Sequence, residues 1–126
     1  MRIIELHIEV SDLERSLAFY QQILPHAKVT RWDDGSALAL VLNDGSAFGL
    51  WQKGKQGVFA GRAAEHLHFA LQVSDTEFQE TKTRLISLGV EIQERTWKGG
   101  QRSVYFTDPD GHQGEFITCD WNELTS

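Results

Sequence analysis

The chain has 126 residues, of which 40% are hydrophobic and 24% charged, with a formal net charge of −6; these proportions are typical of one folded domain with a single core. Its Lys and Arg residues are dispersed, which excludes the basic surface that nucleic-acid binding requires. No apolar run reaches the roughly 18 residues of a membrane span. The single cysteine excludes an intrachain disulfide. We therefore expect a cytoplasmic protein without nucleic-acid or membrane partners.

The first predicted elements are a strand and an amphipathic helix, both within "ELHIEVSDLERSLAFY" (5–20). Up to Val10 the apolar residues alternate with polar ones, which predicts a strand with one packed and one polar face; the polar residues are Glu5, His7 and Glu9. Ser11 and Glu14 have the spacing of a capping box at a helix start, and the helix is expected to stop before Pro25.

Three short strands are predicted after this helix, over residues 29–32, 37–42 and 47–52. The turn signals "DDG" and "NDG" separate them, and such pairs flanked by apolar residues favour hairpins. The first half of the chain is therefore predicted to be a βαβββ module.

The second half repeats the first, because "HFALQVSDTEFQETKT" (68–83) carries the same V-S-D-x-E pattern in the same register. A second capping box, Ser74 with Glu77, predicts a helix that ends at Gly89. Strands are predicted over 90–97, 103–107 and 113–118. We therefore expect one domain over 1–126, made of modules 1–52 and 64–118 that a Gly-rich linker, 53–63, joins.

The repeat also makes polar positions of the two modules equivalent. Its register pairs Glu5 with His68, and the alignment of "NDGSAFG" (43–49) with "PDGHQGE" (109–115) pairs Gly49 with Glu115. Because side chains alternate along a strand, we expect each of these residues on the face of its strand that does not pack against a helix.

The segments "VSDLERSLAFY" and "VYFTDPDGHQGEF" resemble the first-helix and last-hairpin signatures of the vicinal oxygen chelate superfamily. This superfamily includes glyoxalase I, extradiol dioxygenases, fosfomycin-resistance enzymes and bleomycin-resistance proteins, and the resemblance extends over roughly residues 1 to 118. It implies an α+β fold in which two tandem βαβββ modules form a U-shaped mixed and antiparallel sheet around a cup. It also implies a homodimer.

The resemblance further implies a divalent metal site. In metal-binding members the ligands come from the positions that match Glu5, Gly49, His68 and Glu115, and Gly49 has no side chain to coordinate with, so the implied ligands are Glu5, His68 and Glu115. His7, on the same face as Glu5, is an alternative first ligand if the strand slips. One imidazole and two carboxylates suit Mn²⁺, Fe²⁺ or Mg²⁺, with Ni²⁺ and Zn²⁺ as alternatives.

His7 and Tyr105 are the candidate catalytic residues. A bound ion would act as a Lewis acid on vicinal oxygens of the substrate, with His7 or His66 as a nearby general base. Arg95 stands where fosfomycin thiol transferases tend to have a Lys for the phosphonate, and "RWDDG" (31–35) and the Ser103-x-Tyr105 pair also resemble that group. The candidate substrate-binding residues are Trp51, Arg95, Trp97, Ser103 and His66.

Two functions stay open from the sequence. The first is a metal-dependent small-molecule enzyme of the superfamily, acting as a lyase, a thiol transferase or a dioxygenase. The alternative is a metal-free binding protein, similar to the bleomycin-resistance proteins, whose acidic and aromatic groove would sequester a cationic drug. Bound metal in the purified protein distinguishes the two.

Overall fold

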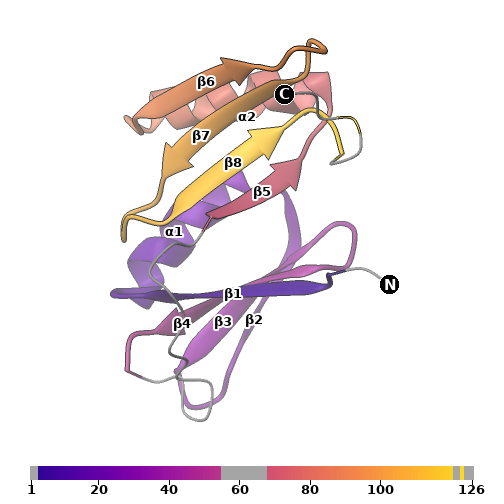
Figure 1. The fold of residues 1–126 in the computed structure, drawn as a ribbon. Coiled ribbons are helices and arrows are strands. Elements are labelled where there is room, and N and C mark those ends of the chain that lie inside the picture. The colour runs from indigo at the N-terminus through magenta and orange to yellow at the C-terminus, as the bar shows by residue number, and fades with distance from the viewer. Residues whose placement is uncertain (1–2, 55–67, 121–122, 124–126) are drawn as a thin grey trace. The chain divides into compact units, whose positions relative to one another are not determined.

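The computed structural model describes residues 3–54, 68–120 and 123. The chain divides into two compact units, residues 1–64 (the first unit) and 65–126 (the second unit). Each unit contains a strand, a helix and three further strands in that order (Figure 1). The predicted α+β class and the two βαβββ modules are therefore confirmed.

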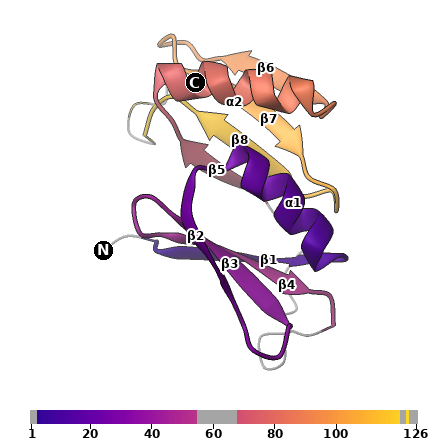
Figure 2. The same cartoon turned by 180° about the vertical axis from the view of Figure 1, so that it is seen from behind.

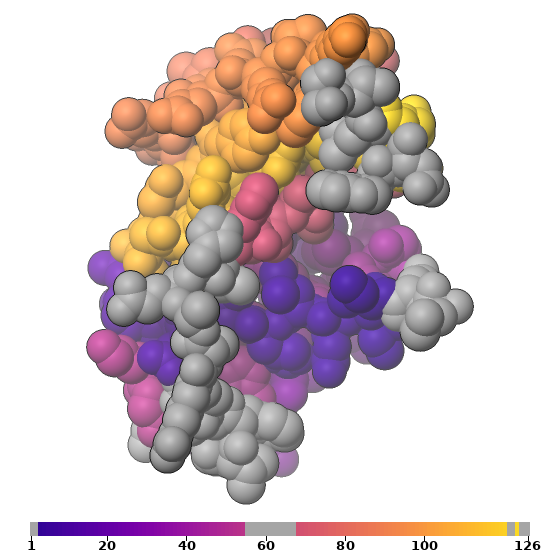
Figure 3. Space-filling model, in the orientation of Figure 1, coloured from indigo at the N-terminus to yellow at the C-terminus, as the bar shows by residue number. Residues whose placement is uncertain are grey.

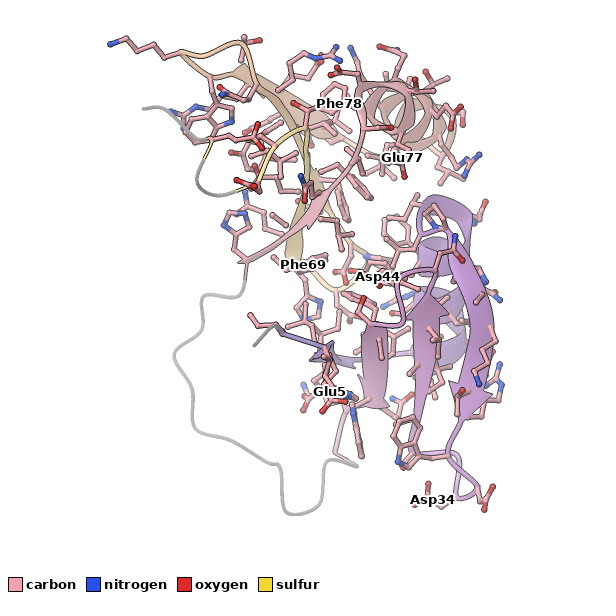
Figure 4. All side chains as sticks on the ribbon, turned by 90° about the vertical axis from the view of Figure 1, so that its right-hand side faces the viewer. Glu5, Asp34, Asp44, Phe69, Glu77 and Phe78 are labelled. Atoms are coloured by element: carbon pink, nitrogen blue, oxygen red, sulfur yellow. The ribbon has the colours of Figure 1, made fainter. Side chains whose placement is uncertain are left out.

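The first unit is a four-stranded mixed sheet with one helix. Its strand order is β1-β4-β3-β2, with β1 parallel to β4 and the other neighbours antiparallel. The two hairpin turns are closed by carboxylates, since Asp34 and Asp44 accept hydrogen bonds from the backbone N–H groups of Ser36 and Ser46, and the two turns lie at opposite ends of the sheet (Figure 4). Its elements are β1 (Glu5–Val10), α1 (Leu13–Ile23), β2 (His26–Arg31), β3 (Ala37–Leu42) and β4 (Ala47–Gln52).

The second unit repeats this arrangement. Its strand order is β5-β8-β7-β6, again with one parallel pair, β5 and β8, and α2 lies across one face of the sheet (Figure 2). Its elements are β5 (His68–Gln72), α2 (Asp75–Ser87), β6 (Ile92–Thr96), β7 (Arg102–Thr107) and β8 (Gln113–Ile117).

Each helix buries the apolar face of its own sheet. In the first unit the ring of Tyr20 on α1 lies 4.7 Å from that of Phe48 on β4. In the second unit Phe106 stacks on Phe116 with centroids 5.4 Å apart, and Gly114 is needed beside them because a Cβ there would overlap the Phe106 ring. The opposite sheet faces therefore carry the polar residues, as the alternation predicts.

Neither α1 nor α2, the helices within the described ranges, is long and apolar enough to cross a membrane.

Figure 3 shows the edge strand β1, in indigo, exposed along one side of the first unit.

The two helices begin with different caps. At α2 the predicted capping box is present: Ser74 accepts from the Glu77 N–H, and the Glu77 carboxylate accepts from the Ser74 N–H; Figure 4 labels Glu77 in this first turn. At α1 the predicted box is wrong. The N-cap is Asp12, whose carboxylate accepts from the Arg15 N–H, because the helix begins one residue later than the Ser-x-x-Glu spacing implies.

This difference predicts the effect of removing each cap. Asp12→Ala and Ser74→Ala should each lower the free energy of unfolding by about 1 kcal/mol, since each leaves a first-turn N–H without its acceptor. Ser11→Ala is the control and should change that free energy by less than about 0.5 kcal/mol. Denaturant unfolding measures all three, and an equal cost for Ser11→Ala and Asp12→Ala would contradict the assignment of Asp12 as the cap.

Candidate functional site

The strand pairing of the two units agrees with the predicted equivalence of their polar positions. In the first unit His7 on β1 lies directly opposite Gly49 on β4. At the corresponding place in the second unit, Ala70 on β5 lies opposite Glu115 on β8. Each pair thus joins one small residue to one long polar residue, but the long residue comes from the first strand of one unit and the last strand of the other.

The second unit brings His68 and Glu115 together. The His68 Nε2 lies 2.9 Å from the Glu115 Oε1 across the parallel pair β5 and β8. The Glu115 side chain is only 6% exposed, whereas that of His68 is 36% exposed. A buried carboxylate needs partners to offset its lost hydration, and the His68 imidazole is one of them.

A chain of hydrogen bonds leads to the same carboxylate from the other side. Tyr105 on β7 lies opposite Glu115, which is near enough to raise the pKa of the Tyr105 phenol. The Ser103 hydroxyl bonds to Tyr105 in turn, and the Trp97 Nε1–H donates to the Ser103 Oγ at 2.9 Å. The indole is only a donor, so the Ser103 Oγ is the acceptor of this bond.

Tyr105 is held as a protonated phenol. Burial raises the pKa of its hydroxyl, and the negative charge of Glu115 and the hydrogen bond to it raise that pKa further. The hydrogen bond from Ser103 and the charge of Arg95 oppose the rise without cancelling it. At neutral pH Tyr105 is therefore a hydrogen-bond donor, which favours a role in orienting groups over the role of a base.

Arg95 and Trp97 form a stacked pair on this face of the second unit. The Arg95 guanidinium carbon lies 3.5 Å from the centroid of the Trp97 ring. A guanidinium that stacks through its plane keeps its N–H donors directed outward in that plane. The side chain is exposed, so it can meet an anionic group from solution.

The first unit carries an acidic and aromatic cluster, which consists of Glu5, His7, Trp32 and Trp51. The Trp51 Nε1–H donates to the His7 Nδ1 at 2.8 Å, and the His7 Nε2 lies 3.3 Å from the Glu5 Oε2. Trp32 meets the His7 ring edge to face, with centroids 6.5 Å apart. Trp32 was not predicted as a site residue, although the repeat aligns "TRW" (30–32) with "RTW" (95–97) and so makes Trp32 the counterpart of Trp97.

The predicted site residues thus fall into two groups. The second unit brings together His68, Glu115, Tyr105, Ser103 and Trp97 as one series, with Arg95 stacked on Trp97, and the first unit brings together Glu5, His7 and Trp51. His66 lies outside the described residues. Within the described ranges no group of three or more His, Cys, Asp or Glu side chains is placed to hold a metal ion, so Glu5 as a third ligand stays a prediction.

Comparison with known proteins places this arrangement in a family. Residues 2–116 match the model of the Glyoxalase/Bleomycin resistance protein/Dioxygenase superfamily. The chain belongs to this superfamily. The match spans both units, so the repeated modules are the superfamily's modules and the predicted resemblance is confirmed.

Within the superfamily, two relatives and one solved structure are informative. A metallothiol transferase FosB from Lysinibacillus sphaericus is 32% identical over 120 residues, which are 90% of this chain and 79% of that protein. A glutathione transferase FosA from Serratia marcescens is 31% identical over 115 residues, covering 87% and 75% of the two chains. A point mutant of the fosfomycin resistance protein FosX from Listeria monocytogenes, solved with Mn(II) and 1S,2S-dihydroxypropylphosphonic acid, has a TM-score of 0.67 at 24% identity and covers 97% of this chain and 95% of its own.

The raised pKa of Tyr105 can be measured directly. The chain has two tyrosines, so a Tyr20→Phe background leaves Tyr105 as the single phenol in an ultraviolet pH titration. We expect a midpoint above the ordinary value of about 10, and a lower one in Glu115→Gln, which removes the negative charge beside the phenol. Burial should still keep that lower midpoint above the ordinary value. Glu94→Gln, a matched change on β6, should leave the midpoint unchanged; an equal shift in both variants would contradict the Glu115 contact.

Proposed function

We propose that the chain is a metal-dependent enzyme of the fosfomycin-resistance type that acts on a small anionic substrate. The observation that carries the proposal is the His68–Glu115 pair, in which an imidazole nitrogen and a buried carboxylate oxygen lie 2.9 Å apart. The names of the two relatives support it, since both are transferases and one is a metallothiol transferase. The FosX structure, which holds Mn(II) and a phosphonate, supports it as well.

The donor atoms of this pair fit a divalent ion. Two ligands at right angles, each about 2.1 Å from an octahedral ion, are about 3 Å apart, which is close to the separation in the structure. A carboxylate with an imidazole suits Mn²⁺, Fe²⁺ or Zn²⁺. When bound, such an ion would polarise substrate oxygens as a Lewis acid. We propose His68 and Glu115 as two of its ligands and keep Glu5, from the superfamily resemblance, as the proposed third.

The other residues of the second unit then orient the ligands and the substrate. Tyr105, opposite Glu115, would help to orient that carboxylate through its hydroxyl, and Trp97 holds the neighbouring Ser103 by a hydrogen bond. Arg95, flattened on Trp97, would bind the anionic group of the substrate, because a guanidinium matches the oxygens of a phosphonate or carboxylate in pairs. Dimerisation stays a prediction from the superfamily resemblance.

One observation favours the alternative, a metal-free protein that sequesters a cationic aromatic ligand. The first unit places Glu5 beside His7 and two indoles whose centroids are 5.7 Å apart. Indole rings attract cations through their faces, and a nearby carboxylate adds to that attraction. This function requires neither His68 nor Glu115, so substitution of those two residues separates the hypotheses.

Metal binding tests the leading proposal. Wild-type protein should bind divalent metal at a fixed stoichiometry, measured by calorimetric titration and elemental analysis. His68→Ala and Glu115→Gln should each weaken that binding at least about 10-fold, since each removes a proposed ligand. His26→Ala and Glu94→Gln are matched controls elsewhere in the chain and should bind as wild type does. A wild-type chain that takes up no divalent metal would contradict the enzyme and favour the sequestering protein.

Substitution of Arg95 tests the anion-binding role. Arg95→Gln should weaken binding of a small phosphonate to the metal-loaded protein by roughly 10-fold or more, because a charge-assisted hydrogen bond contributes about 1.5 to 3 kcal/mol. Arg95→Lys keeps the charge but loses the paired donors, so its affinity for the phosphonate should lie between those of wild type and Arg95→Gln. Lys98→Gln removes a positive charge from the turn beyond β6 and serves as the control. Equal affinity in wild type and Arg95→Gln would show that the anion binds elsewhere.

A further inference from the structure

The imidazole of His7 occupies the space above Gly49. The two residues lie directly opposite each other on the parallel strands β1 and β4, and a Cβ on Gly49 would overlap the His7 ring. Any larger residue at position 49 would therefore displace the imidazole. This explains why a glycine stands at the position equivalent to Glu115: its missing side chain makes room for His7.

Trp51 fixes which nitrogen of His7 carries the proton. The Trp51 indole N–H can only donate, and it lies 2.8 Å from the His7 Nδ1. The Nδ1 must therefore be the acceptor, so in the neutral ring the proton is on Nε2. The two rings are tilted at 58° with centroids 6.2 Å apart, so Trp51 also packs beside the imidazole that lies over Gly49.

The proton on Nε2 is directed at Glu5. The His7 Nε2 lies 3.3 Å from the Glu5 Oε2, and the two side chains are 29% and 61% exposed. The three side chains thus follow one another, with the Trp51 indole N–H on the His7 Nδ1 and the His7 Nε2 beside one oxygen of Glu5. The second oxygen of that carboxylate takes no part in the series.

We propose that His7 is a positioning residue whose Nε2–H orients the Glu5 carboxylate, with Trp51 setting the tautomer. This rests on the proposed function, in which Glu5 is a metal ligand. It gives His7 a role different from the general base or the replacement ligand that the sequence suggests, because its Nδ1 accepts from Trp51 and its Nε2 faces the Glu5 carboxylate. Carboxylates that bind metals are commonly held by such hydrogen bonds, and loss of the partner typically lowers metal affinity 10- to 100-fold.

The tautomer can be observed without metal. Long-range ¹H–¹⁵N spectra of the full labelled chain, recorded for the neutral ring, should show His7 with its proton on Nε2. Trp51→Phe removes the donor and should shift the ¹⁵N resonances toward a mixture of tautomers. Trp32→Phe is the matched control, because Trp32 meets the same ring edge to face, and it should leave the tautomer unchanged. A proton on Nδ1 in wild type, or equal effects of the two Trp variants, would overturn the proposal.

Metal affinity separates a positioning residue from a ligand. His7→Gln keeps an N–H donor at the place of Nε2 and should bind metal within a few-fold of wild type, whereas His7→Ala should bind it about 10- to 100-fold more weakly. Loss of the bound metal in His7→Gln, as in His68→Ala, would make His7 a ligand and overturn the proposal. Binding that is lost in His68→Ala but unchanged in His7→Ala would overturn the positioning role and leave the proposed function standing. Absence of metal in wild type would contradict the proposed function. The tautomer spectra would still test whether Trp51 sets the tautomer of His7.

Discussion

The buried carboxylate of Glu115 is the constraint on which the second unit depends. Its side chain is 6% exposed, and an ionised carboxylate in such a place is costly unless charged or hydrogen-bonding groups surround it. His68 meets it from β5 and Tyr105 from β7, so three neighbouring strands must keep their register for the charge to be tolerated. The same carboxylate, with an imidazole nitrogen 2.9 Å from it, offers the oxygen and nitrogen atoms that can bind a cation.

Glycines determine where the long side chains lie in each unit. Gly114 precedes Glu115 and leaves room for the Phe106 ring on the packed face, while Gly49 leaves room for His7 on the polar face of the first unit. Each unit therefore presents one imidazole and one carboxylate. In the first unit both come from β1, and in the second unit they come from β5 and β8. A duplicated module can thus keep its fold while the strand that carries each polar side chain differs between the copies.

Much of the fold follows from the sequence, because its signals are local. Period-two alternation, the capping box at Ser74 and the turn glycines each specify a short stretch of backbone, and the V-S-D-x-E repeat relates the modules. Several boundaries differed: α1 is capped by Asp12 and not by Ser11, and β6 covers only Ile92–Thr96 of the predicted 90–97. The strand β2 begins at His26, earlier than predicted, because it pairs with Leu42 at the far end of β3 across a bulge. Such pairing is set by the partner strand and cannot be read from the strand itself.

The site was predictable only in part, since its contacts join residues that are distant in sequence. The repeat register correctly related Gly49 to Glu115 and Glu5 to His68, and the structure places His68 beside Glu115. The role of His7 depends on hydrogen-bond direction, which Trp51 sets from the neighbouring strand β4, and Trp97 likewise donates to Ser103. An indole at those positions reads in the sequence as an apolar residue, so its function as a directed donor was not visible there.

The central claim is that the His68–Glu115 pair binds a divalent ion. Titration of the labelled chain with Zn²⁺, followed through the His68 ¹⁵N resonances, tests it most directly. We predict that the Nε2 signal changes from that of a protonated donor to that of a metal-bound nitrogen at one equivalent. His112, whose Nδ1 contacts Asp108 at 2.9 Å, should keep its signals. Unchanged His68 resonances at saturating metal would contradict the account.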